Sequence, residues 1–273
     1  MLTRAIFLLS LTLTGLFIYA IARPDPSAPT AEVPDVAFVP QLAALDAKLD
    51  IHKILRDVCT ELSAQKAPWL AVKFRQAMRD GSRSFVTQGS FQRGPAGCAR
   101  LELEIIDGPP LAKLTVVSDG ELLAQARRIG LGEPSVTIAK IPTSDRHRQD
   151  GFLINAGCGG PGAVLEQMNQ HLQGATLQSG HLGDRAVTLV EGEFDRAPAN
   201  LPPTIRARVR AGRIYLDAQT RWPCRLEWWA AKPSAERRPL LSVDYLDLEL
   251  GRQLSDEDCK KTFSYHPDSP AKK

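Results

Sequence analysis

The 273-residue sequence has few of the residues that metal and nucleic-acid sites require. It has five Cys, five His and no C-x-x-C pair. Zinc sites usually draw on closely spaced Cys and His, so this spacing argues against a metal. Lys and Arg total 34 against 31 Asp and Glu, and aromatic residues make up only 6%. A basic surface with interleaved aromatics is therefore missing, and we expect no metal, no cofactor and no nucleic-acid partner.

The cysteines are too few and too scattered to define a disulfide framework. Their number is odd, so at least one thiol stays unpaired in a monomer. One or two disulfides remain open, and the spacing does not say which residues would pair: Cys59, Cys98, Cys158, Cys224 and Cys259.

The N-terminal segment has the pattern of an export signal. Residues 5–22 form an 18-residue run without a charge, and Ala20-Ile21-Ala22 matches an A-x-A cleavage site. Residues 1–22 are therefore predicted to be a signal peptide or, if uncleaved, a membrane anchor. Residues 23–40 hold five prolines, so 23–39 are predicted to be an extended linker. Either alternative predicts an exported chain, in the periplasm or anchored facing the extracytoplasmic side.

A helix and then a run of strands follow the linker. Residues 41–67 have helical periodicity that Pro68 ends, with one apolar face at Ile51, Ile54, Leu55, Val58 and Leu62. From residue 69 the period changes to two, and six segments up to residue 141 are separated by short turns rich in Gly, Pro and Asp. This succession predicts an antiparallel meander. Strands resume after residue 174, so the fold class is mainly β (α+β).

The motif G-x-G-x-x-G, at Gly157, Gly159 and Gly162, interrupts the strands. A dinucleotide site needs a parallel βαβ unit and an acidic residue at the end of the next strand. The surrounding elements are antiparallel, and the segment 175–182 offers no carboxylate. We interpret the glycines as the start of a helix over residues 160–172.

Neither the carboxylates nor the cysteines form a recognisable catalytic set. Glu102 and Glu104 are expected on a strand exterior, and residues 256–258 on a strand exterior or in a loop, as solvated charge. Cys158 precedes a helix, but no family signature surrounds it. The sequence therefore predicts no enzyme and no catalytic residue.

The tryptophans raise a different question. Alternation in "WPCRLEWW" predicts Trp222, Cys224, Leu226 and Trp228 on one side, away from Arg225 and Glu227. A sheet with one broad apolar face must either close into a filled barrel or curve around a cavity for an apolar ligand.

The order of several short motifs resembles the lipoprotein-carrier family typified by LolA. Its F-x-Q strand is matched by Phe74-Arg75-Gln76, and its hairpin "DG" by Asp119-Gly120. Its closing motifs are matched by Asp217, Thr220 and Pro223, then by Phe263, Tyr265 and Pro267. The family also has an arginine that locks its helical lid. Arg93 and Arg100 both qualify here, and the sequence does not choose between them.

The resemblance implies an incomplete antiparallel β-barrel with a helical lid over residues 40–268, preceded by the N-terminal helix and followed by a tail at 269–273. It implies an apolar ligand, a lipid or acyl chain, and a role as lipoprotein or lipid carrier, with no protein partner named. The alternative is a non-catalytic structural or protein-interaction module of the cell envelope with a filled core. The predicted ligand cavity is formed by eight residues: Phe74, Phe85, Phe91, Leu103, Ile105, Trp222, Leu226 and Trp228.

Overall fold

The computed structural model describes residues 37–41, 50–80, 83–106, 112–142, 152–154, 158–199, 201–234 and 237–266. The predicted export segment, all of the predicted linker before residue 37, Pro267 and the C-terminal tail lie outside these ranges. Within them, no helix combines the length and the apolar character needed to cross a membrane.

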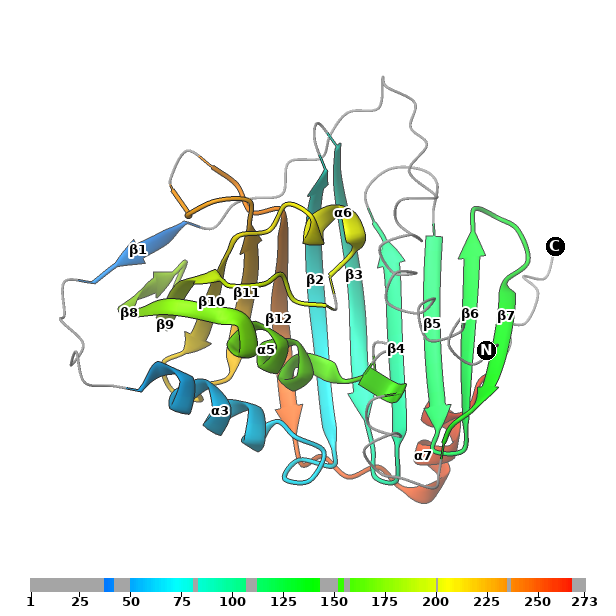
Figure 1. Ribbon diagram of the computed structural model, residues 1–273. Helices are drawn as coiled ribbons and strands as arrows, with labels where there is room; N and C mark the ends of the chain where they lie inside the picture. The colour runs from blue at the N-terminus through cyan, green and yellow to red at the C-terminus, as the bar shows by residue number, and fades with distance from the viewer. Residues whose placement is uncertain are drawn as a thin grey trace.

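Twelve antiparallel strands form a single sheet in the order β1-β8-β9-β10-β11-β12-β2-β3-β4-β5-β6-β7. The two outer strands of this order, β1 and β7, do not pair with each other, so the described sheet is open and matches the predicted incomplete barrel (Figure 1). The strands are β1 (Phe38–Pro40), β2 (Leu70–Asp80), β3 (Arg83–Arg93), β4 (Cys98–Ile105), β5 (Ala112–Asp119), β6 (Leu122–Ile129), β7 (Ser135–Lys140), β8 (Leu172–Leu182), β9 (Arg185–Phe194), β10 (Ala211–Asp217), β11 (Pro223–Trp229) and β12 (Leu241–Leu250).

The predicted meander is confirmed as β2 to β7, in which each strand pairs with the next. Alternation explains its two faces, because successive side chains of a strand point to opposite sides. In β4, Leu101, Leu103 and Ile105 are buried. Strand β1 pairs with β8, so Phe38 and Val39 belong to the sheet although the sequence suggested linker.

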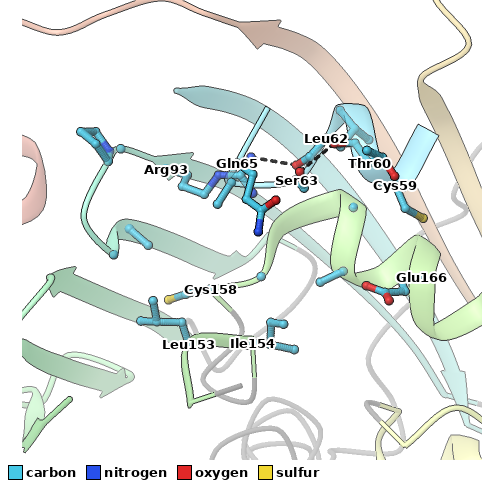
Figure 2. Close-up of a pocket in the computed structure, with 18 of the residues that line it drawn as sticks. Cys59, Thr60, Leu62, Ser63, Gln65, Arg93, Leu153, Ile154, Cys158 and Glu166 are labelled. Carbon is cyan, nitrogen blue, oxygen red and sulfur yellow. Dashed lines mark hydrogen bonds between the residues drawn. The ribbon is translucent and has the colours of Figure 1, made fainter. Parts of the chain in front are cut away.

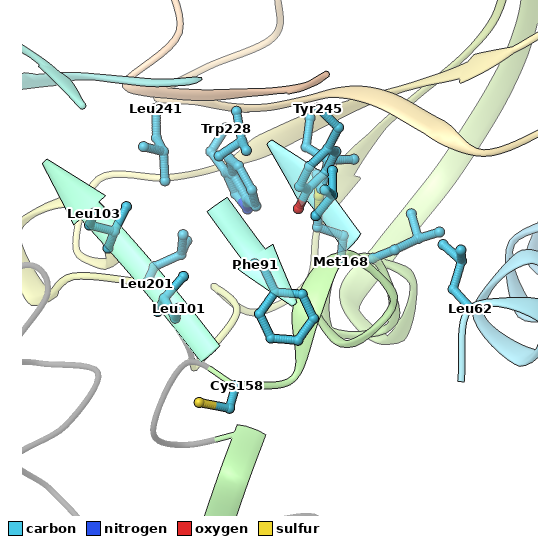
Figure 3. Packing of buried hydrophobic residues seen from close by; sticks show 14 of the residues in the cluster. Leu62, Phe91, Leu101, Leu103, Cys158, Met168, Leu201, Trp228, Leu241 and Tyr245 are labelled. Carbon is cyan, nitrogen blue, oxygen red and sulfur yellow. The ribbon is translucent and has the colours of Figure 1, made fainter. Parts of the chain in front are cut away.

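Three helices lie over one face of the sheet: α3 (Ile51–Glu61), α5 (Gly160–His171) and α6 (Pro203–Arg206) (Figure 1). The predicted apolar face of the first is confirmed, since Leu55, Val58 and Leu62 are buried. The helices and the sheet enclose one large hydrophobic core, part of which is drawn in Figure 3.

A fourth helix, α7 (Asp256–Phe263), packs against β4 and β5 and corrects a sequence expectation. The acidic residues 256–258 lie in its first turn, and not on a strand or in a loop. Ser255 caps the helix by accepting a hydrogen bond from the backbone N–H of Asp258. Acidic residues favour the first turn because they complement the helix dipole, and these three remain exposed as expected.

Candidate functional site: a pocket between the helices and the end of the sheet

A pocket of about 960 Å³ lies where α3 ends, α5 begins and β3 turns into β4 (Figure 2). Such a volume lies at the upper end of the ~300–1,000 Å³ range of small-molecule sites. Figure 2 shows Leu153 and Ile154 on one side of it, opposite the segment from Cys59 to Gln65.

Arg93 fixes the α3 side of the pocket. Its guanidinium donates to the carbonyl oxygens of Leu62, at 2.8 Å, and Ala67, at 2.6 Å. The last carbonyls of a helix lack partners within the helix, so a buried arginine can hold them. Arg100 instead donates to Glu102 and to the carbonyl of Thr262 in α7. Of the two arginines that the sequence left open, Arg93 is thus the one that contacts the α3 segment.

The glycine motif forms the opposite wall. Gly159 is the N-cap of α5, and Gly160 has a φ of 69°, which favours glycine. A Cβ on Gly162 would lie 3.1 Å from the Cβ of Leu62, so glycine allows α3 and α5 to approach closely. The predicted helix start is therefore confirmed, whereas Gly157 lies outside the described residues.

The lining changes from apolar to polar with exposure. The buried lining residues include Leu62, Ala99, Leu153 and Cys158, whereas residues such as Arg56, Thr60, Gln65 and Glu166 are exposed. Apart from Arg93, whose buried guanidinium is held by two backbone carbonyls, the pocket therefore has an apolar bottom, and its exposed rim carries both signs of charge.

None of the three thiols that line this pocket is activated, and burial raises the pKa of one of them, Cys98, to about 11. Burial raises the pKa of Cys158 to about 12. Burial, assisted by the charge of Glu166, raises the pKa of Cys59 to about 12. A thiol with such a pKa is protonated at neutral pH and is a weak nucleophile. These thiols are therefore poorly suited to act as nucleophiles at neutral pH.

The eight residues predicted to form a ligand cavity lie together, but elsewhere. All belong to the main core or pack against it, and none lines the pocket. Five are buried and three are partly buried, namely Phe74, Phe85 and Trp222. The two regions meet at Phe91, because a Cβ on Gly160 would lie 2.5 Å from its ring. Ligand contact by these eight residues stays a prediction.

The motif residues Asp217 and Thr220 have a structural role in the turn between β10 and β11. The Oδ1 atom of Asp217 accepts hydrogen bonds from the backbone N–H groups of Gln219 and Thr220 and from the Thr220 hydroxyl. Although partial burial opposes the change, these bonds lower the pKa of Asp217. These turn hydrogen bonds explain the spacing of Asp217 and Thr220, for which the order of motifs offers no physical reason.

A bulge corrects the predicted facing of Cys224. Tyr215 pairs with Arg225 but Leu216 pairs with Pro223, so Cys224 is an extra residue in its strand. It packs with Tyr215 in a second cluster that also includes Val187 and Leu189. Leu226 and Trp228, in contrast, face the main core as predicted.

A buried ionic network occupies the other face of the same strand, and the sequence analysis missed it. Glu227 accepts hydrogen bonds from the Tyr215 hydroxyl at 3.1 Å and from Nε1 of Trp229 at 3.0 Å. Arg225 pairs with Asp244 at 2.5 Å and lies 3.7 Å from Glu227. Burial raises the pKa of the Glu227 carboxyl, although Arg225 opposes this shift. Alternation predicted that Arg225 and Glu227 would share a face, but not that this face would be buried.

Several known structures are similar in fold to this chain. LprF from Mycobacterium bovis is 13% identical over 81% of this chain and 97% of its own, with a TM-score of 0.44. A LolA superfamily protein from Nitrosomonas europaea is 12% identical over 80% and 98%, with a TM-score of 0.30. A chain of the Pseudomonas aeruginosa MucA/MucB complex is 13% identical over 77% of this chain, with a TM-score of 0.36.

This chain spans 60% of that MucA/MucB component, which is less than two thirds of its length. No protein-family model matches the sequence, and no curated protein matches it. At such identities the function of the chain must be argued from its own residues.

Proposed function

We propose that this protein binds an amphiphilic apolar ligand, a lipid or acyl chain, in the pocket between α3, α5 and the β3–β4 turn, without catalysing a reaction on it. The observation that carries the proposal is the order of the lining residues, with a bottom that is apolar except for the backbone-bonded Arg93 and with a polar exposed rim. A hydrocarbon chain gains ~25 cal/mol for each Å² of apolar surface removed from water, whereas its polar head keeps its hydration at the rim.

The proposal also includes the eight core residues that the sequence predicted as a ligand cavity, because this part of the core lies beside the pocket. The first turn of α5 separates the pocket from Phe91, so a chain that displaces this turn reaches the core. The indole N–H of Trp228 is buried there without a hydrogen-bond partner among the described residues. A buried unpaired donor costs about 1–3 kcal/mol, and a carbonyl oxygen of a ligand would satisfy it.

A direct test uses a fluorescent fatty-acid analogue and one matched pair of variants. Ile154 lines the pocket and is 36% exposed, so Ile154→Asp places a charge in the wall at little cost to folding. Ile138 undergoes the same chemical change on β7, away from the pocket and 61% exposed. We expect saturable binding by the wild type, about tenfold weaker binding by Ile154→Asp, and unchanged binding by Ile138→Asp.

Absence of binding by the wild type, or equal weakening by both variants, would contradict a site in this pocket. Native mass spectrometry of protein purified from a host with membranes then identifies any lipid that remains bound.

A second candidate function is a structural or protein-interaction module with a filled core. The packing of the eight residues favours it, since Phe91, Leu226 and Trp228 are at most 2% exposed. This candidate predicts a protein that binds no fatty-acid analogue and whose stability does not respond to lipid.

We further propose that the chain works outside the cytoplasm, either released by cleavage after Ala22 or held by residues 1–22. The uncharged run and the A-x-A pattern support this proposal. N-terminal sequencing of the protein from its native envelope distinguishes a start at Arg23 from an intact Met1, and recovery only from the cytosol would contradict export.

A further inference from the structure

The helix α7 brings together two cysteines that lie 161 positions apart in the sequence, Cys98 and Cys259. The helix α7 packs directly against β4, which begins at Cys98. Burial raises the pKa of the Cys98 thiol, and Cys259 lies close enough to contribute to this shift. Both side chains are of intermediate exposure, whereas Cys158 and Cys224 are buried.

The positions of the two cysteines on their elements support the same proximity. Cys98 and Arg100 share one face of β4, because they are two residues apart. Cys259, Thr262 and Phe263 share one face of α7, at the spacing i, i+3 and i+4.

Two contacts join the last turn of α7 to β4 and to the turn that precedes it. Arg100 donates to the carbonyl oxygen of Thr262 at 3.1 Å. Phe263 is 2% exposed, and a Cβ on Gly94 would lie 2.9 Å from its ring. One helical turn before this anchored end, Cys259 faces the start of β4.

We propose that Cys98 and Cys259 form a disulfide that fastens α7 to the sheet when the protein meets a disulfide oxidant. With oxidised glutathione as the oxidant, one cysteine thiolate attacks a glutathione sulfur and displaces one glutathione thiolate. The sulfur of the second cysteine then displaces the other glutathione. Two thiol protons pass to the two glutathione products, so one disulfide is reduced while another forms.

This pairing uses two of the five cysteines and is tested without a ligand, although Cys98 also lines the pocket. Cys59, Cys158 and Cys224 remain thiols. Burial raises the pKa of Cys98 to about 11, with the neighbouring Cys259 adding to the shift. Because the thiolate is the attacking species, the bond is expected to form faster as the pH rises.

The test treats the purified, reduced full chain with oxidised glutathione, blocks the remaining thiols under denaturing conditions, and maps the peptides by mass spectrometry. We expect one crosslinked peptide pair that joins Cys98 to Cys259, with the other three cysteines alkylated. The oxidised protein should also melt at a higher temperature than the reduced one, by ~10 °C for so long a closed loop.

Two variants make the outcome decisive. Cys259→Ser should abolish both the crosslink and the difference in melting temperature, whereas Cys59→Ser should keep both. Glutathione left singly on Cys98 and Cys259, a crosslink that includes another cysteine, or five free thiols would each overturn the proposal.

Discussion

The two faces of strand β11 bury their side chains in opposite ways. On one face, Leu226 and Trp228 enter an apolar core that is held by non-directional packing. On the other, Arg225 and Glu227 are 5% and 4% exposed and depend on specific partners in neighbouring strands. Apolar contacts can rearrange around a guest, whereas a buried charge tolerates little displacement of its partner.

This difference assigns separate roles to the two faces. The ionic face fixes how β10, β11 and β12 align, because Tyr215 of β10 bonds to Glu227 of β11 and Asp244 of β12 pairs with Arg225 of β11. The apolar face can then adapt to a ligand without loss of the sheet. Changes on the ionic face should therefore cost mainly stability, and changes on the apolar face should alter mainly binding.

Replacing Glu227 by Ala should have the largest effect. The change leaves the Tyr215 hydroxyl and the Trp229 indole N–H without their shared acceptor and removes a negative charge beside the buried Arg225, which keeps Asp244. We expect a loss of about 3–5 kcal/mol in the free energy of unfolding. Denaturant unfolding measures it. Lys73→Ala is the control, because the pair of Lys73 with Asp247 is exposed and should be worth less than ~1 kcal/mol. If both variants lose the same free energy of unfolding, the buried network contributes no more stability than an exposed ion pair.

The next test makes the same chemical change on each face. Tyr215→Phe removes a hydroxyl that donates to Glu227, so we expect a cost of about 1–3 kcal/mol. Tyr245 is buried on the apolar face, and its hydroxyl has no hydrogen-bond partner among the described residues. Tyr245→Phe should therefore be close to neutral. The contrast between the faces is wrong if Tyr245→Phe costs as much as Tyr215→Phe.

A smaller, pH-dependent effect is expected from Asp217. Its pKa is lowered in the folded protein, so it contributes stability that is present above its unfolded pKa and is lost as the pH falls through its folded pKa. Asp217→Asn can keep the turn but does not titrate. Below pH ~4, the wild type should therefore lose stability more steeply than the variant. Parallel curves of stability against pH would contradict a role for the ionised carboxylate.

Sequence alternation predicted the meander and the inward face because both depend on a local period. It could not place Cys224, since a single bulge after Pro223 reverses the facing of one residue. It also missed α7, although Ser255 with Asp258 three residues later is a capping pattern.

The pocket and the cysteine pair depend on contacts between distant segments, which no local pattern encodes. The glycines at the start of α5 were the one local pattern near the pocket, and the sequence correctly predicted a helix start there. Their close contact with Leu62 could not be predicted, because it depends on where α3 lies in the fold. For the same reason, five cysteines without a framework could not reveal that Cys98 meets Cys259.

Apart from the control variants, the smallest change in stability is expected for Trp228→Phe, which tests packing and ligand binding at the same residue. The substitution removes core volume, which destabilises, and also removes a buried donor that lacks a partner, which stabilises. These opposing terms should leave the free energy of unfolding within about 1 kcal/mol of the wild type.

Ligand binding should distinguish the role of the Trp228 indole N–H from the role of its volume. If the indole N–H donates to a ligand carbonyl, Trp228→Phe weakens displacement of the fluorescent probe by methyl palmitate about tenfold, a loss of ~1.4 kcal/mol. Displacement by hexadecane, which has no carbonyl, should be unchanged, whereas Ile154→Asp should weaken both. Equal effects of Trp228→Phe on the two competitors would remove the hydrogen bond from the proposal, and a stability loss of several kcal/mol would mean that Trp228 serves packing alone.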